Sequence, residues 1–221
     1  MTVVASGSGI TLHTRASTML RRAMRLFGTA PRSMAGETVQ IERLGHETDW
    51  TWTATVSATI RSDGSFHALW HTNHIGAFQI RAVVGGPTAS TAPTTASTGS
   101  AGPFQPAVTP SGAATPALST TVYRRSFATQ YGPGFYGRRT ACGQRLHRDT
   151  IGLANKKLRC GTMVALYFRG RTLSVPVIDR GPYANGADWD LTTATAQALG
   201  IDGSAAIGAV SLPAPPASPP S

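Results

Sequence analysis

The sequence predicts a mainly β protein with two small domains, a β-sandwich followed by a small closed barrel. Three observations predict it: alternating strands before residue 85, a charge-poor segment rich in Pro, Ser, Thr and Ala, and later strands that enclose one short helix. The chain has 221 residues, which is long enough for two small domains that each bury a hydrophobic core. We expect a sandwich at 10–85, a disordered linker at 86–121, a barrel at 122–212 and a disordered tail at 213–221.

The predicted sandwich consists of short segments in which apolar and polar residues alternate. Asp63-Gly64 is a turn signal between two of them. Residues 17–27 also show helical spacing, but the β pattern that follows favours a strand there. The predicted strands are Thr38–Arg43, Trp50–Ile60, Phe66–Trp70 and Phe78–Val84.

The predicted barrel combines strands with a single helix. A hairpin turns about Arg169-Gly170-Arg171, and Pro176, which cannot donate to a ladder, belongs at an edge or a crossover. Asp190 or Thr192 can cap a helix that Gly200 ends. The predicted strands are Ser126–Tyr131, Met163–Phe168, Leu173–Ile178 and Ala205–Leu212.

Asp179 is the candidate catalytic residue. It follows a run of β-forming residues and precedes Arg180 and a Gly-Pro turn, so a strand presents its carboxylate at the rim of a sheet. A structural alternative is that Asp179 caps the turn and pairs with Arg180.

Charge and cysteine content narrow the class of protein. Lys and Arg outnumber Asp and Glu by 20 to 10, so a net charge of +10 suits a polyanionic partner. Nucleic acid is disfavoured, because no recognition-helix, zinc-finger or RNA-binding motif accompanies the charge. Cys142 and Cys160 favour a disulfide over a metal site, and hence an extracytoplasmic location.

We expect neither a cofactor nor a metal, and a monomer without a membrane span. Histidines at 67, 71 and 74 are poorly spaced for one ion and read as surface residues. Residues 1–10 lack the basic and apolar regions of a signal peptide. We therefore expect that a signal preceding this chain is missing, rather than export by another route.

The first domain resembles the bacterial immunoglobulin-like modules of secreted actinobacterial proteins. The resemblance rests on Gly36, Val39, Ile41, Arg43, Trp52, Asp63, Gly64, Ser65, Phe66, Gly76, Phe78 and Arg81. We expect this domain to act as an anchor or spacer and to have no catalytic role.

Residues 126 to about 210 resemble the rare lipoprotein A (RlpA) domain, a double-psi β-barrel shared with expansins and family 45 glycoside hydrolases. The resemblance rests on segments 127–141, 158–162, 179–183, 190–191 and 198–200, which occur in the family's order. It implies a six-stranded barrel with a sugar-binding groove. It also implies a septal or cell-wall lytic transglycosylase that cleaves peptidoglycan strands lacking stem peptides and leaves 1,6-anhydro-muramoyl ends.

Within this resemblance, Asp179 would be the acid and base of the reaction. The residues expected to bind substrate are Tyr131, Gln144, Asn155, Arg180, Tyr183, Trp189 and Asp190. Gln144 and Asn155 replace a Glu and a His of the family's pattern, and an amide cannot transfer protons at neutral pH.

Three functions therefore stay open. The first is the transglycosylase, acting on peptidoglycan strands. The second is a non-catalytic, expansin-like protein that binds or loosens the wall by gripping these strands or another acidic wall polymer. The third is a structural role in which the sandwich docks a protein partner and the barrel is vestigial.

Overall fold

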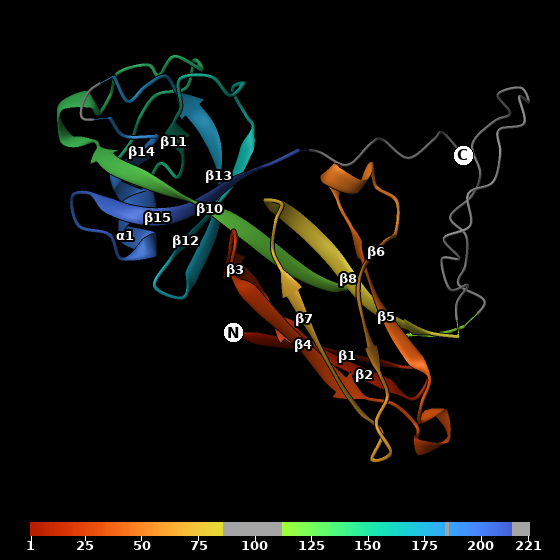
Figure 1. The fold of residues 1–221 in the computed structure, drawn as a ribbon. Helices are drawn as coiled ribbons and strands as arrows, with labels where there is room; N and C mark the ends of the chain where they lie inside the picture. The colour runs from red at the N-terminus through yellow and green to blue at the C-terminus, as the bar shows by residue number, and fades with distance from the viewer. Residues whose placement is uncertain (86–111, 184–185, 214–221) are drawn as a thin grey trace, which may run out of the picture.

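The computed structural model describes residues 1–85, 112–183 and 186–213, which form two β-domains joined side by side (Figure 1). The expectations for residues 86–111 and 214–221 lie outside this described part. Within these described residues, three short 3₁₀ turns lie between strands: η1 (Arg32–Met34), η2 (His46–Thr48) and η3 (Pro133–Phe135).

The N-terminal domain is a sandwich of two sheets. One sheet has the order β1-β2-β4-β7, with β1 (Thr2–Gly7), β2 (Ile10–Arg15), β4 (Ala23–Thr29) and β7 (Ser65–His71). The other contains β6 (Thr53–Thr59), β5 (Thr38–Leu44), β8 (Gly76–Val84) and β10 (Leu118–Tyr131), flanked by β3 (Ser17–Met19) and β9 (Ala113–Ala114). Leu26 and Phe66 of the first sheet share one buried core with Ile41 and Phe78 of the second. The alternation read from the sequence produces this core, since successive strand residues face opposite sides.

Two expectations for this domain need correction. The strand expected at Trp50–Ile60 begins only at Thr53, because Asp49 and Trp50 adopt left-handed φ values of 49° and 56° in the turn after η2. Trp52 lies outside the strand, and the Arg81 guanidinium stacks 4.1 Å above its ring. The ambiguous segment 17–27 is extended, as the strand prediction requires, and Arg21 (φ 64°) turns the chain between β3 and β4.

The predicted end of the linker and the predicted beginning of the sandwich were also wrong. Residues 113–114 and 118–121 form strand structure that the sequence assigned to the linker, and β1 adds residues 2–7 to the sandwich. Leu118 and Val122 are buried in the sandwich core, and β10 pairs with β8 from Leu118 to Val122. Thr, Ser and Ala occur in this strand and in the linker alike, so composition did not separate them.

The C-terminal domain is a closed barrel of six strands, because β14 pairs with both β11 and β10. Around the barrel the order is β10, β14 (Trp189–Thr192), β11 (Leu153–Ala154), β13 (Arg171–Asp179), β12 (Met163–Phe168) and β15 (Ala205–Leu212). Strand β10 belongs to both domains: it pairs with β8 at its beginning and with β15 and β14 further along. The fold class predicted from the sequence is confirmed.

Local signals explain the barrel's connections. The β12–β13 hairpin turns at Arg169 and Gly170, which have φ values of 45° and 87°. Pro176 is the last residue of β13 to pair with β12, and from Val177 onward β13 pairs with β11, so the crossover reading of Pro176 is confirmed. Helix α1 (Thr193–Leu199) is capped by Thr192 and not by Asp190, which lies within β14.

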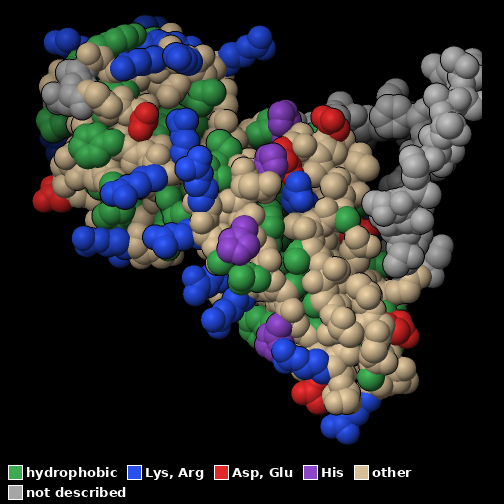
Figure 2. All heavy atoms as spheres, in the orientation of Figure 1, with side chains coloured by type: hydrophobic (Ala, Val, Ile, Leu, Met, Phe, Trp, Pro, Cys, Tyr) green, Lys and Arg blue, Asp and Glu red, His purple; other side chains and the backbone are tan. Residues whose placement is uncertain are grey.

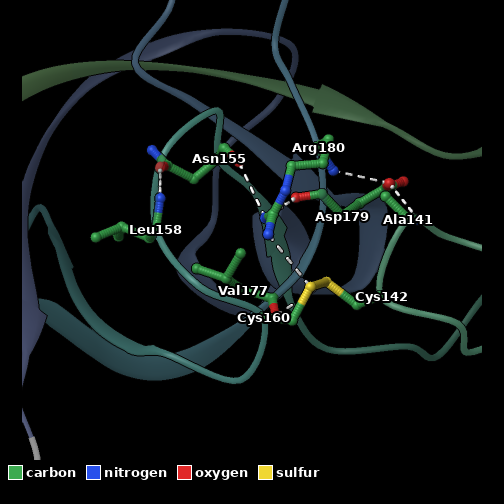
Figure 3. The surroundings of a disulfide bond; sticks show 8 residues. All are labelled: Ala141, Cys142, Asn155, Leu158, Cys160, Val177, Asp179 and Arg180. Atoms are coloured by element: carbon green, nitrogen blue, oxygen red, sulfur yellow. Dashed lines mark hydrogen bonds between the residues drawn. A yellow bond between two sulfur atoms is a disulfide. The ribbon is translucent and has the colours of Figure 1, made fainter.

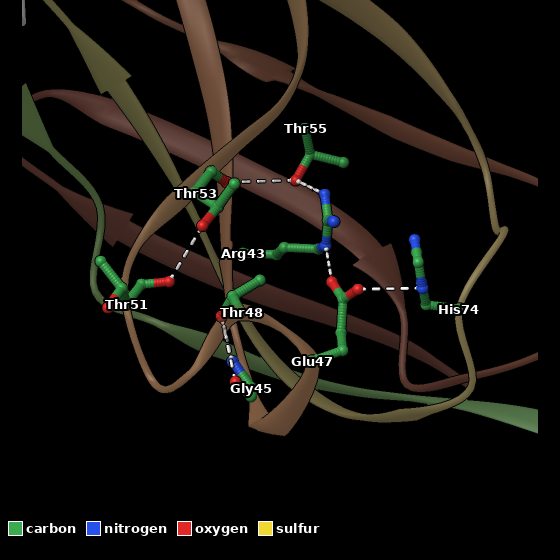
Figure 4. A network of polar contacts seen from close by, with 8 residues as sticks. All are labelled: Arg43, Gly45, Glu47, Thr48, Thr51, Thr53, Thr55 and His74. Atoms are coloured by element: carbon green, nitrogen blue, oxygen red, sulfur yellow. Dashed lines mark hydrogen bonds and ion pairs between the residues drawn. The ribbon is translucent and has the colours of Figure 1, made fainter. Parts of the chain in front are cut away.

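The sandwich histidines have polar and aromatic neighbours. His74 Nδ1 lies 3.0 Å from Glu47 Oε2, and Glu47 also binds Arg43 (Figure 4). The ring of His67 is 6.1 Å from that of Phe27. In residues 1–85, 112–183 and 186–213, no three His, Cys, Asp or Glu side chains gather as metal ligands, and no helix is long and apolar enough to cross a membrane.

Candidate active site in the barrel groove

Three neighbouring barrel strands bring two carboxylates to one end of the barrel. Ala154 of β11 is in register with Asp179 of β13 on one side and with Asp190 of β14 on the other. The two aspartates are therefore about two strand spacings, roughly 10 Å, apart at the backbone. Ala154 is small and only 3% exposed, so it forms a floor above which both carboxylates project into one pocket. Tyr131, at the end of β10, lines the same pocket.

The Asp179 side chain is fixed by backbone donors. Its Oδ1 accepts hydrogen bonds from the N–H groups of Ala141 and Arg180, both at 2.8 Å (Figure 3). Within the described residues, no hydrogen bond is made to its other oxygen, Oδ2. One oxygen thus orients the carboxylate, and the other is available to a ligand.

Asp190 and Tyr131 titrate abnormally because they are buried near another acid. Burial raises the pKa of Asp190, the Asp179 carboxylate raises it further, and a 2.7 Å hydrogen bond from Thr129 Oγ1 opposes the rise. The pKa of Tyr131 is raised strongly by burial and then by the two carboxylates. Its hydroxyl is therefore protonated at neutral pH and can donate a hydrogen bond.

The pocket has a volume of about 440 Å³ and a basic rim formed by Arg138, Arg139 and Arg180. Two buried hydroxyls in its lining, those of Tyr131 and Thr140, have no hydrogen-bond partner among the described residues. Buried polar groups in proteins are nearly always satisfied, so unpaired donors at a pocket wall indicate a polar ligand. The pocket therefore suits a hydroxyl-rich molecule with negative charge.

A disulfide between Cys142 and Cys160 fixes the loops beside the end of β13, which confirms the predicted pairing (Figure 3). The N–H of Cys142 donates to Ile178 O, and the N–H of Gly161 donates to Val177 O. The Arg180 guanidinium contacts Cys160 Sγ at 3.4 Å and donates to Asn155 O at 3.3 Å. The strand end that carries Asp179 is thus held from both sides.

The structure brings together some predicted site residues and separates others. Tyr131, Arg180, Tyr183 and Asp190 line the pocket with Asp179, and Tyr183 is 80% exposed at its edge. The structural alternative for Asp179 holds in part, because its carboxylate accepts from the backbone N–H of Arg180 in the turn. Among the described residues, its second half, an ion pair with the Arg180 guanidinium, is not found.

Three predicted substrate-binding residues do not line this pocket. The Oδ1 of Asn155 accepts from the N–H groups of Lys157 and Leu158, and its Nδ2 donates to Asp188 O, so the side chain fixes a turn. Gln144 is exposed in the loop after Cys142. Trp189 is buried in the barrel core at 6% exposure. Its placement follows from strand alternation, since the neighbouring Asp190 takes the groove face.

Sequence reasoning predicted Arg180 but missed Thr140 and the other two arginines of the basic rim, Arg138 and Arg139. Arg138, Arg139 and Thr140 follow the Gly132-Pro133-Gly134 turn, which brings the chain back over the groove. The pair of arginines beside that turn was the available signal.

A closed six-stranded barrel with a carboxylate-bearing groove defines the C-terminal domain as a double-psi β-barrel. Residues 115–211 match the family model described as "Lytic transglycolase". This domain is an RlpA-like double-psi β-barrel.

Curated relatives support that assignment. "Probable endolytic peptidoglycan transglycosylase RlpA" of Synechocystis sp. is 40% identical over 87 residues, covering 38% of this chain and 27% of the relative. The protein of the same name from Aquifex aeolicus is 40% identical over 81 residues, 36% of each chain. "Endolytic peptidoglycan transglycosylase RlpA" of Campylobacter jejuni is 32% identical over 74 residues, 33% of this chain and 27% of the relative. This chain thus spans about a quarter to a third of the length of these relatives.

Among solved structures, the Streptomyces papain inhibitor (SPI) aligns with a TM-score of 0.33 and 21% identity over 40% of this chain and 93% of its own.

Proposed function

We propose that the barrel is an endolytic lytic transglycosylase that cleaves peptidoglycan glycan strands lacking stem peptides, with Asp179 as its acid and base. The observation that carries the proposal is the position of Asp179. In an RlpA-like barrel it lies at a strand end, oriented through Oδ1 and free at Oδ2, in a pocket with a second carboxyl group and a phenol. The names of the curated relatives support the same activity. We further propose that the protein acts outside the cytoplasm, as a monomer, at the cell wall.

The chemistry needs only one proton-transfer group. Protonated Asp179 donates its proton to the glycosidic oxygen, the bond from that oxygen to C1 breaks, and positive charge develops on the sugar ring. The Asp179 carboxylate then removes the proton of the 6-hydroxyl of the same sugar, and O6 bonds to C1. The product is a 1,6-anhydro ring, and the proton returns to Asp179 without participation of water.

Other pocket residues position the strand in this scheme. A glycan strand without stem peptides has a free lactyl carboxylate on each muramoyl residue, and the basic rim offers guanidinium groups to it. The protonated hydroxyl of Tyr131 donates to a sugar oxygen, and Tyr183 offers an exposed ring face at the pocket edge.

A specific observation favours a second candidate, a non-catalytic, expansin-like wall-binding protein. Gln144 and Asn155 are amides where the RlpA pattern has an acid and a base, and neither side chain lines the pocket. Loss of a proton-transfer partner costs about 10² to 10⁴ in rate. The second candidate keeps the groove and its cationic rim for binding alone.

Product analysis separates the two functions. The oxidised full-length chain is incubated with purified peptide-free glycan strands, and the products are identified by mass spectrometry. We expect anhydro-ended fragments from the wild type and from Asp149→Asn, a control at an exposed aspartate outside the pocket. Asp179→Asn should lower the rate at least about 100-fold.

Intact strands that co-sediment with all three proteins would contradict the enzyme and support the expansin-like candidate. Fragments with ordinary reducing ends, in which water has added at C1, would instead indicate a hydrolase and refute the role of the 6-hydroxyl.

A further inference from the structure

A second and larger cleft, of about 860 Å³, lies where the sandwich meets the barrel. Its sandwich wall is the turn from Met19 to Arg22, its barrel walls are the β12–β13 hairpin at Phe168 and the segment 200–208, and Arg125 of β10 lies between them. Ligand sites are commonly this size and occur preferentially at domain junctions. The cleft shares no lining residue with the groove that contains Asp179.

The two domains are held in one arrangement around this cleft. Strand β10 runs through both sheets, and the N–H of Leu20 donates to Tyr123 O at 2.8 Å. Met19 packs against Gly208 of the barrel so closely that a Cβ on the glycine would lie 3.1 Å from the Met19 sulfur. The cleft is therefore formed before any ligand arrives, which lowers the entropic cost of binding.

Three arginines face this cleft from three different elements. Arg22 is set by Thr72, a residue 1% exposed, whose Oγ1 accepts from the Arg22 N–H at 3.2 Å and donates to Arg22 O at 3.0 Å. Arg169 occupies the left-handed position of its hairpin turn, and Arg125 comes from the shared strand. Their separate origins spread the positive charge along the cleft.

The protein compensates only part of this positive charge. Asp202 is the one acidic residue in the described lining of the cleft. The acid–base contacts found in residues 1–85, 112–183 and 186–213 are Arg43–Glu47, His74–Glu47 and Arg81–Glu42, all within the sandwich. Figure 2 shows Lys and Arg side chains gathered on the barrel and at its junction with the sandwich. A concave surface with unpaired guanidinium groups attracts an anionic ligand.

The apolar part of the lining indicates which kind of anion fits. Phe168 is half-buried with the Arg169 guanidinium 5.1 Å from its ring, and Ile201 lies in the cleft wall. Apolar walls suit the faces of sugar rings, and spaced guanidinium groups suit charges that repeat along a chain rather than a single phosphate. We propose that this junction cleft binds an acidic glycan, a chain of sugar rings that carry carboxylates, through Arg22, Arg125 and Arg169.

The cleft is inferred independently of the cleavage chemistry, and only the choice of the peptide-free glycan strand as ligand rests on the proposed function. Binding at the cleft would hold the strand about 20 Å from the groove, since Tyr131 is six residue steps along β10 from Arg125. The cleft would then act as a remote subsite for long strands.

The test measures binding in the chain carrying Asp179→Asn, in which cleavage is expected to be at least about 100-fold slower. Dissociation constants are measured for peptide-free glycan strands and for chitin oligosaccharides, which share the sugar backbone but lack carboxylates. The cleft variant Arg22→Ala/Arg125→Ala/Arg169→Ala is compared with Arg15→Ala/Arg25→Ala/Arg61→Ala, which removes the same charge from exposed arginines outside the cleft. Circular dichroism establishes that both variants are folded.

We expect the cleft variant to bind peptide-free strands about tenfold more weakly, and the control variant to bind within about twofold of the parent. Equal weakening in both variants would overturn the proposal, because the effect would then be one of net charge. Chitin oligosaccharides that bind as tightly as the acidic strands would also overturn it. Single-stranded DNA is tested as a further ligand. If it binds more tightly than the glycan strands, and if the cleft variant loses this binding, the ligand of the cleft is a nucleic acid and not a glycan.

Cleavage is followed separately, with the three cleft substitutions placed in the chain that retains Asp179. Relative to the wild type, this variant should lose more activity on long strands than on short ones. If neither protein cuts any strand, the proposed function fails while the binding result for the cleft still stands.

Discussion

At the scale of single residues, Asp190 connects function with stability. Its raised pKa arises from burial and then from Asp179, so the native state holds this proton more tightly than the unfolded state, where the pKa is about 3.9. The contribution of Asp190 to stability therefore falls as the pH rises from about 3.9 through the higher native value. A buried carboxyl group that lowers the stability of the protein at neutral pH is typical of a functional site.

We predict that Asp190→Asn becomes more stable relative to wild type as the pH rises from 3 to 7. The amide carries no charge to desolvate, and its carbonyl can still accept from Thr129. Urea unfolding at several pH values measures the difference, with Asp149→Asn as the exposed control. A difference in unfolding free energy that is independent of pH would contradict the assigned titration.

At the scale of elements, the short helix α1 is tied to the barrel by one buried side chain. Thr195, 0% exposed, accepts from the Gly152 N–H at 2.9 Å through Oγ1, and its hydroxyl lies 2.9 Å from Gly152 O. Gly152 precedes β11, which carries Ala154, the floor between the two carboxylates. The helix therefore supports the groove from behind.

We predict that Thr195→Val destabilises the protein by about 1–3 kcal/mol, because the isosteric side chain leaves the buried Gly152 N–H without a partner. Thr172→Val, on the exposed side of β13, should change stability by less than about 0.5 kcal/mol. Denaturant unfolding of both variants measures this difference. If the two variants lost the same unfolding free energy, the hydrogen bonds of the Thr195 hydroxyl would contribute nothing to stability.

At the scale of elements, sequence patterns predicted some features of the fold and site and not others. The hairpin at Arg169 and the strand 205–212 followed from turn and alternation signals among neighbouring residues. The Cys142–Cys160 pair followed from the cysteine count, since the chain has two cysteines. The position of Asp179 at a strand end beside a pocket was predictable because a run of β-forming residues leads directly into it. Alternation places Trp189 and Asp190 on opposite faces of β14, but strand pairing decides which face meets the groove. The exclusion of Asn155 depends on turn hydrogen bonds, so no local pattern specifies either outcome.

At the scale of the whole molecule, the largest surprise is that the two domains share a strand. Composition predicted a linker up to residue 121, yet β10 completes the second sandwich sheet before it enters the barrel. A small core of Tyr123, Ala165 and Val210, with Met19 packed against it, lies at this junction. Its members are far apart in the sequence, so only the assembled fold reveals it. The two domains should therefore unfold as one unit.

Gly208 tests that expectation. An added Cβ would lie 2.8 Å from Tyr123 Cβ and 3.1 Å from Met19 Sδ, so Gly208→Ala must displace β15 from the shared strand β10 and from Met19. We predict a loss of about 1–3 kcal/mol, whereas Gly134→Ala, where a Cβ meets nothing within 4 Å, should be nearly neutral. Native-state hydrogen exchange in β8 and β12 reports the sandwich and the barrel separately. Because β10 is common to both, we expect equal loss of protection in both strands; loss confined to β12 would show that the sandwich holds its stability without the barrel.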